Sequence, residues 1–120
     1  MAKGAKVLVV DDEVVFSELM SGTFKDAGFQ VECASAGKKA IEEGKKFKPD
    51  LLFCDWQLRD GTTGLDVAKA LRRENPRLKV VVVTGLADRA EAALRGFPVS
   101  CLIEKPCDSR EVVKVVRSLV

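Results

Sequence analysis

Four short runs of apolar residues recur along the chain, and each run stops abruptly at polar side chains. The runs and the residues that follow them are 7–10 before Asp11 and Asp12, 51–54 before Asp55, 80–83 before Thr84, and 101–103 with Glu104 before Lys105. Runs of this length, bounded by polar residues, are too short for helices and predict buried strands. If these strands are parallel, the polar residues that follow them gather at one edge of the sheet, where open α/β sheets place ligand sites.

Apolar residues at helical spacing fill the intervals between the strands. The predicted strands cover 6–11, 29–33, 50–55, 79–84 and 100–104, and the predicted helices end at Gly28, cover about 36–47, run from about 65 to Asn75, cover about 87–95, and start at Asp108 or Ser109. The first helix is expected to bury Phe16, Leu19, Met20, Thr23, Phe24 and Ala27. Ser35 is expected to cap the second helix. Strict alternation of strand and helix predicts one doubly wound α/β domain over residues 1–120, with a parallel sheet and helices on both faces.

Composition narrows the range of functions. The 20 basic and 18 acidic side chains give a net charge of +2, which favours neither a nucleic-acid nor a membrane partner. No apolar segment approaches the ~20 residues of a membrane span, and the first residues lack the apolar centre of a signal peptide, so a cytoplasmic location is expected. The chain has no histidine. Ser-His-Asp and Cys-His mechanisms are therefore excluded, and any phosphohistidine must belong to another molecule.

The carboxylates at the predicted strand ends carry the candidate chemistry. Asp11, Asp12 and Asp55 brought together would repel one another and raise at least one pKa. Each aspartate could instead cap the helix that follows it. A divalent cation, Mg²⁺ or Mn²⁺, is the functional alternative, because carboxylate and carbonyl oxygens are the ligands such ions prefer. With Lys105 and Thr84 near a phosphoryl group, Asp55 would act as a nucleophile that forms an acyl phosphate.

The same motifs resemble the receiver domain of bacterial response regulators over essentially the whole chain. The matching features are the acidic residues at 11–13 after an apolar strand, Asp55 at the end of the central strand, Thr84 after a valine run, and the Lys105-Pro106 pair. The resemblance implies a flavodoxin-like (βα)5 sandwich with strand order 2-1-3-4-5. It also implies that Asp55 is the phosphoacceptor and that Thr84 and Lys105 bind the phosphoryl group.

The metal site that the resemblance implies uses four residues. Asp12 and Asp55 would be direct ligands, Asp11 would act mainly through water, and Gln57 would offer its backbone carbonyl. The implied phosphodonor is a sensor histidine kinase or a phosphotransfer protein. Phosphorylation would shift the face formed by the fourth helix, the fifth strand and the fifth helix. This face would meet a downstream protein target or an output domain absent from these residues, in a monomer or a phosphorylation-linked dimer. No turnover of an external substrate is expected beyond the domain's own phosphorylation and dephosphorylation.

Several positions depart from the family pattern. Leu102 stands where an aromatic residue is usual, three residues before the lysine, and Arg59 stands where proline is usual, four residues after the acceptor. Gly85 and Cys107 replace a common alanine and phenylalanine, and the loop from Asp55 to the glycine at 64 is one residue longer. These changes affect how a signal is read out rather than how it is received.

Two other functions compete with this interpretation. A magnesium-dependent phosphatase of the haloacid-dehalogenase type also uses a strand-end aspartate, but it needs a second carboxylate two residues later, and Gln57 occupies that position. The other alternative is a degenerate receiver that binds proteins without being phosphorylated.

Overall fold

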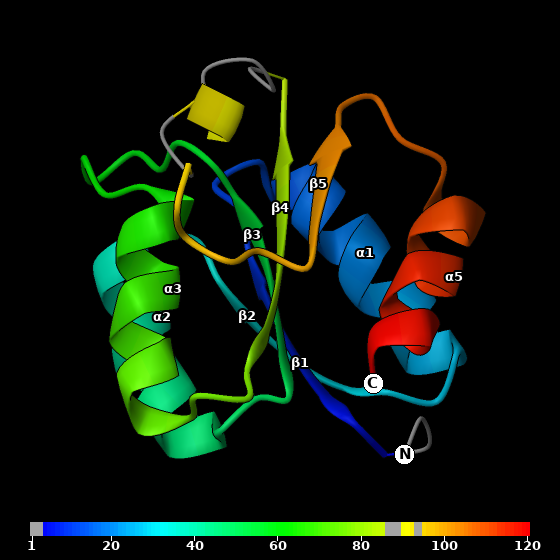
Figure 1. Ribbon diagram of the computed structural model, residues 1–120. Helices are drawn as coiled ribbons and strands as arrows, with labels where there is room; N and C mark the ends of the chain where they lie inside the picture. The colour runs from blue at the N-terminus through cyan, green and yellow to red at the C-terminus, as the bar shows by residue number, and fades with distance from the viewer. Residues whose placement is uncertain (1–3, 86–89, 93–94) are drawn as a thin grey trace.

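A five-stranded sheet crosses the middle of the molecule, with helices on both sides (Figure 1). The computed structural model describes residues 4–85, 90–92 and 95–120. The elements are β1 (Lys6–Val10), α1 (Val14–Asp26), β2 (Gln30–Ala34), α2 (Gly37–Phe47), β3 (Leu51–Asp55), α3 (Gly64–Glu74), β4 (Lys79–Thr84), β5 (Cys101–Glu104) and α5 (Ser109–Leu119). The strand order is β2-β1-β3-β4-β5 and every neighbouring pair is parallel. The predicted doubly wound sandwich with order 2-1-3-4-5 is confirmed.

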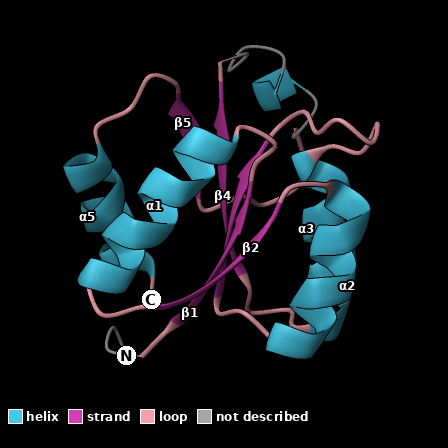
Figure 2. Cartoon of the chain, turned by 180° about the vertical axis from the view of Figure 1, so that it is seen from behind, coloured by secondary structure: helices cyan, strands magenta, loops and turns pink. Residues whose placement is uncertain are grey.

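The two faces of the sheet are covered by different helix pairs. α1 and α5 lie on one face, and α2 and α3 lie on the other (Figures 1 and 2). Alternate residues of the central strands point to opposite faces, so that Phe53 packs toward α1 while Leu52 packs toward α2 and α3. Both faces are therefore buried, which explains why the central strands read as continuous apolar runs rather than alternating ones. β2 lies at an edge, as its alternating sequence predicted.

The described element boundaries agree with the predicted ones to within about two residues, the usual spread between assignment methods. The helix predicted at about 87–95 falls largely outside the described residues. Within that range, residues 90–92 are described and are helical. Asp108 is the N-cap of α5, where its side chain accepts a hydrogen bond from the Arg110 amide.

Two local predictions are wrong. Ser35 does not cap α2, because the N-cap position belongs to Ala36 and the amide of Lys38 instead donates to Asp60 Oδ2 at 2.9 Å. Leu19 is not buried: 55% of its surface is exposed. The buried stripe of α1 instead runs through Ser17, Met20, Ser21 and Phe24.

The sheet topology positions the candidate site. The chain leaves β1 toward β2 on one side and later returns to β3 on the other side, so the carboxyl ends of β1 and β3 border a crevice. Val10 pairs with Cys54, and Thr84 pairs with Glu104. The residues that follow each strand therefore come together at this edge. Among the described residues, no helix has the length and apolar character needed to span a membrane.

Candidate functional site

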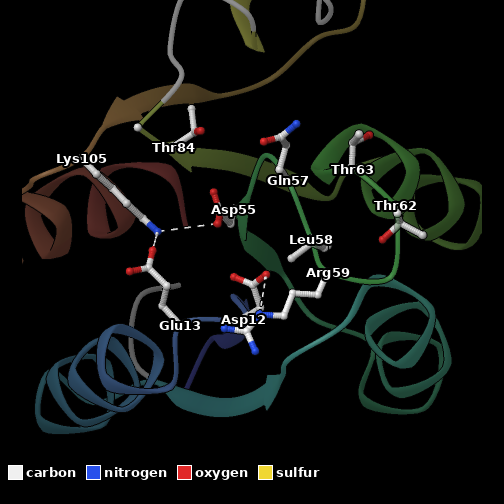
Figure 3. Close-up of a pocket in the computed structure, with 12 residues that line it drawn as sticks. Asp12, Glu13, Asp55, Gln57, Leu58, Arg59, Thr62, Thr63, Thr84 and Lys105 are labelled. Atoms are coloured by element: carbon white, nitrogen blue, oxygen red, sulfur yellow. Dashed lines mark hydrogen bonds and ion pairs between the residues drawn. The ribbon is translucent and has the colours of Figure 1, made fainter.

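A pocket of about 590 Å³ opens at the carboxyl ends of β1, β3, β4 and β5 (Figure 3). Its lining comes from four strand ends and the β3–α3 loop, and consists of Asp12, Glu13, Asp55, Gln57, Leu58, Arg59, Gly61, Thr62, Thr63, Thr84, Gly85 and Lys105. Every predicted site residue except Asp11 lines this pocket. Asp11 lies deeper, with 2% of its surface exposed.

Three carboxylates cluster at the centre of the site. Asp11, Asp12 and Asp55 each offer an oxygen atom, and these oxygens lie within 4.8 Å of one another. Neither Asp11 nor Asp12 caps α1, whose N-cap position is Glu13 and has no side-chain hydrogen bond. The alternative that these aspartates merely cap the next helix is therefore wrong. An all-oxygen cluster of this size fits a hard divalent cation.

Asp11 has both of its oxygens engaged by the protein. Oδ1 accepts from the Glu13 amide at 2.8 Å, and Oδ2 accepts from Lys105 Nζ at 2.9 Å. This arrangement leaves Asp12 and Asp55, whose side chains are 17% and 12% exposed, as the carboxylates that face the pocket. The geometry suits the indirect role predicted for Asp11.

Asp55 has one oxygen fixed by the backbone and one near a cation. Oδ1 accepts from the Trp56 amide at 2.8 Å, and Oδ2 lies 3.7 Å from Lys105 Nζ. The pKa of Asp55 is raised to about 6, mainly by burial and also by the charges of Asp11 and Asp12, against the opposing effects of Lys105 and the Trp56 amide. The mutual repulsion predicted from the sequence is thus found at the predicted acceptor.

Lys105 lies beside the acidic residues of two strand ends, Asp11 and Glu13 after β1 and Asp55 at the end of β3. Besides Asp11, its ammonium group donates to Glu13 Oε1 at 2.6 Å, and it lies 4.5 Å from the centre of the Phe16 ring. Burial lowers the pKa of Lys105, but the hydrogen bonds to Glu13 and Asp11 outweigh this effect and hold the pKa above its ordinary value. The group is therefore a fixed positive charge beside Asp55.

The remaining predicted residues occupy the rim of the pocket. Thr84 is buried at the end of β4, with 2% of its surface exposed, and it lines the same pocket as Asp55 (Figure 3). Gln57 is the second residue of the β3–α3 loop and is exposed. A glycine at position 64 is needed nearby, because a Cβ there would lie 2.8 Å from the Asp55 carbonyl oxygen.

Two contacts were not anticipated from the sequence. Glu13 holds Lys105, although it was noted only as part of an acidic triplet. Arg59, noted only as a departure from the family pattern, places Nε 3.5 Å from Asp12 Oδ2. The sequence features that could have indicated these contacts are the place of Glu13 in the acidic run 11–13 and the place of Arg59 in the loop after Asp55.

Comparison with known proteins agrees with this geometry. The family model described as "Response regulator receiver domain" matches residues 7–117. The chain belongs to the response regulator receiver domain family. Receiver domains are signalling modules of two-component systems rather than enzymes that turn over external substrates, and they receive their signal from histidine kinases or phosphotransfer proteins.

Individual relatives of this receiver domain are regulatory proteins. It is 36% identical over 116 residues to the probable transcriptional regulatory protein TcrX of Mycobacterium tuberculosis, covering 95% of this chain and 49% of TcrX. It is 35% identical to the photosynthetic apparatus regulatory protein RegA of Rhodovulum sulfidophilum, covering 93% of this chain and 61% of RegA. The receiver domain therefore spans about half the length of these two curated relatives.

A solved structure provides a match along nearly the full chain. The crystal structure of a response regulator receiver protein from Sinorhizobium medicae superposes with a TM-score of 0.87 at 31% identity, covering 99% of this chain and 96% of that one. The chemotaxis response regulator CheY4 of Vibrio cholerae superposes equally well, with a TM-score of 0.87 at 24% identity, which shows the shared fold.

The departures from the family pattern have definite positions in the structure. Leu102 is half-buried and packs toward the α2–α3 face of the core. Cys107 is half-buried on the opposite face, where burial raises the pKa of its thiol. Gly85 is exposed at the rim of the pocket. None of the three is a predicted phosphorylation or metal-binding residue, although Gly85 lines the same pocket as those residues.

Proposed function

We propose that the chain, as one receiver domain over residues 1–120, accepts a phosphoryl group on Asp55 from a phosphohistidine of a sensor histidine kinase or a phosphotransfer protein. The observation that supports this most strongly is the environment of Asp55. Its Oδ1 is held by the Trp56 amide, while Oδ2 faces an open pocket beside a fixed ammonium group. This carboxylate has a defined direction of attack and a neighbouring positive charge to stabilise the product.

The proposed transfer is a simple displacement at phosphorus. Asp55 Oδ2 supplies an electron pair to form the new P–O bond of the acyl phosphate. The P–N bond to the donor's imidazole breaks, and the imidazole nitrogen keeps the electron pair. Lys105 and the Thr84 hydroxyl bind oxygens of the phosphoryl group, since such reactions depend on positioning and charge neutralisation. Water later attacks phosphorus, the P–O bond to Asp55 breaks with its electron pair left on the carboxylate, and inorganic phosphate is released.

The donor set fits a resident Mg²⁺ or Mn²⁺. Asp12 and Asp55 would hold the ion directly, Asp11 would act through water, and the Gln57 carbonyl would complete the protein ligands. When bound, the ion would neutralise charge on the phosphoryl oxygens and on the clustered carboxylates. The close approach of the three carboxylate oxygens supports this assignment, because such a cluster needs a cation to offset its repulsion.

The direct test is phosphorylation by acetyl phosphate with MgCl₂, followed by intact mass measurement. We expect a gain of one phosphoryl group that is labile to hydroxylamine, requires the divalent cation, and is absent from the Asp55→Asn protein. EDTA added before acetyl phosphate should prevent the gain of the phosphoryl group, because it removes the divalent cation. A protein that stays unmodified under these conditions would refute the proposal and favour the alternative of a receiver that only binds proteins.

An exposed apolar surface beside the pocket fits the proposed donor protein. Val14, Val15 and Leu19 of α1 expose 61%, 82% and 55% of their surfaces, and α1 begins directly after Glu13. Clustered exposed apolar side chains commonly mark protein contacts. A phosphodonor helix that packs on these residues would bring its phosphohistidine to the mouth of the pocket.

Replacement of Val15 by glutamate is expected to slow phosphoryl transfer from a histidine kinase at least about tenfold, because a charge would be buried in the contact. Phosphorylation by acetyl phosphate should be unchanged, since Val15 is not part of the pocket. Lys69→Gln is the control, because Lys69 is exposed on α3 and its replacement lowers the net charge of the protein by the same amount. Kinase transfer rates would be measured with a kinase that phosphorylates the unaltered protein. Equal transfer rates for Val15→Glu and the control would exclude this surface as the contact.

A further inference from the structure

A guanidinium group lies over the acidic cluster from the side opposite Lys105. Arg59 projects from the β3–α3 loop, and its Nε lies 3.5 Å from Asp12 Oδ2 (Figure 3). The two cations thus divide the carboxylates between them: Lys105 contacts Asp11 and Glu13, and Arg59 contacts Asp12. Arg59 stands at a position where the family resemblance led us to expect proline.

The loop that carries Arg59 is fixed on both sides of this residue. Leu58 is buried, and its amide donates to the Thr62 carbonyl at 3.1 Å. Asp60 accepts from the Thr62 hydroxyl at 2.6 Å and from the amide of Lys38 at 2.9 Å, which ties the loop to the start of α2. The backbone at Arg59 is therefore held in place, although 80% of its side chain is exposed.

Arg59 forms its ion pair with Asp12, a carboxylate that a divalent cation would also bind. Asp12 is 17% exposed, and its carboxylate belongs to the cluster whose oxygens lie within 4.8 Å of one another. A guanidinium beside this carboxylate offsets part of the negative potential of the pocket, and it repels any second cation that approaches the same oxygen. The ion and Arg59 cannot both interact with Asp12 at full strength.

We propose that Arg59 is a built-in competitor of the divalent cation, which lowers the affinity of this receiver domain for Mg²⁺ through its ion pair with Asp12. This role rests on the proposed function, because it presumes that the acidic cluster binds the ion. Arg59 is here a positioning residue that acts through Asp12. The effect is electrostatic and the Arg59 side chain is exposed to solvent, so the effect weakens as ionic strength rises.

The test is a titration with MgCl₂, followed by calorimetry and by the fluorescence of Trp56, the single tryptophan, next to Asp55. We expect Arg59→Gln to lower the dissociation constant for Mg²⁺ by about three- to tenfold at low salt, with a smaller difference at high KCl. Arg59→Lys should stay within about twofold of the unaltered protein, because it restores the charge. Arg73→Gln removes an exposed charge from the far end of α3 and should change nothing.

The possible outcomes separate this proposal from the one on which it rests. If the unaltered protein binds Mg²⁺ and Arg59→Gln binds it with the same or lower affinity, Arg59 is not a competitor, while the metal site stands. If none of these proteins binds Mg²⁺, the metal site itself is refuted, and the role of Arg59 is refuted with it. An equal gain in affinity for Arg73→Gln would show a general effect of net charge and would also overturn the proposal.

Discussion

Replacement of Asp55 by asparagine is expected to stabilise the unphosphorylated protein at neutral pH while it removes the phosphorylation site. Asp55 has a folded-state pKa of about 6 because burial and the charges of Asp11 and Asp12 disfavour its ionised form. Asparagine keeps the oxygen that accepts from the Trp56 amide but carries no charge. The full pKa difference corresponds to about 3 kcal/mol, and because solvent screens part of it we expect a gain of about 1–2 kcal/mol in the free energy of unfolding.

The sign of this effect reverses the usual behaviour of a paired carboxylate. A carboxyl group whose pKa is raised by folding binds its proton more tightly in the folded state, so its contribution to stability is fully present below the unfolded pKa and is lost as pH rises through about 6. The advantage of Asp55→Asn should therefore vanish near pH 4 and reach its full size above about pH 7. Urea unfolding followed by Trp56 fluorescence, in buffers that contain EDTA, measures this directly.

Magnesium provides the matched control for this prediction. A ligand that binds only the folded protein stabilises it. Mg²⁺ should therefore stabilise the unaltered protein more than Asp55→Asn and narrow the difference between them at neutral pH. A difference that is independent of pH, or an asparagine variant that is less stable at neutral pH in EDTA, would show that the carboxylates do not strain the fold.

Much of the fold could be predicted because parallel sheets expose so little of their strands. The runs around Val80–Val83 and Phe53 are buried on both faces, so they appear in the sequence as uninterrupted apolar segments that end at polar residues. The common direction of parallel strands then places those polar ends together without any further information. This is why Asp11, Asp55 and Lys105 could be assigned to one site before the structure was known.

The errors arose where a partner is distant in sequence or where a polar residue is buried. Leu19 seemed a better core residue than Ser17, but α1 turns its small serine side chains toward the sheet and leaves Leu19 exposed. Ser35 seemed the natural cap of α2, but the carboxylate of Asp60 on another loop binds the amide of Lys38. Hydrophobic periodicity and local capping rules contain no information about either contact.

The same limit applies to the interior of the site. The strand ends predicted which carboxylates would meet, but not that Glu13 would hold Lys105 or that Arg59 would approach Asp12. These contacts depend on how a loop folds back across the sheet edge. They distribute the positive charge of the pocket between the partly buried ammonium of Lys105 and the exposed guanidinium of Arg59, which differ in how strongly solvent screens them.

Removal of the ammonium group is expected to have the opposite effect on stability from removal of the Asp55 charge. In Lys105→Met most of the unbranched apolar side chain is kept, but the ammonium group over the Phe16 ring is lost. Asp11, Glu13 and Asp55 thereby lose their shared cation. Because Asp11 is buried, we expect a loss of about 1–3 kcal/mol in the free energy of unfolding at neutral pH. Phosphorylation by acetyl phosphate should slow by about 10²-fold, as for loss of one preorganised charge at a reacting group.

The pH dependence distinguishes this loss from a simple packing defect. Lys105 lowers the pKa of Glu13 through a hydrogen bond, so the stability from this pair is present above the unfolded pKa of Glu13 and is lost as pH falls through its folded pKa. The Glu13 part of the deficit of Lys105→Met should therefore be complete above the ordinary Glu13 pKa of 4.5 and disappear as pH falls below it. A second part should grow as pH rises through about 6, because Lys105 no longer lowers the pKa of Asp55. Combining the two substitutions should recover part of the lost stability but none of the phosphorylation, because the double variant has one repelling charge fewer and no acceptor.

Lys114→Met, an exposed lysine on α5 paired with Glu111, should change stability by less than about 0.5 kcal/mol. A Lys105→Met protein that matches this control in stability and in phosphorylation rate would remove Lys105 from the proposed mechanism.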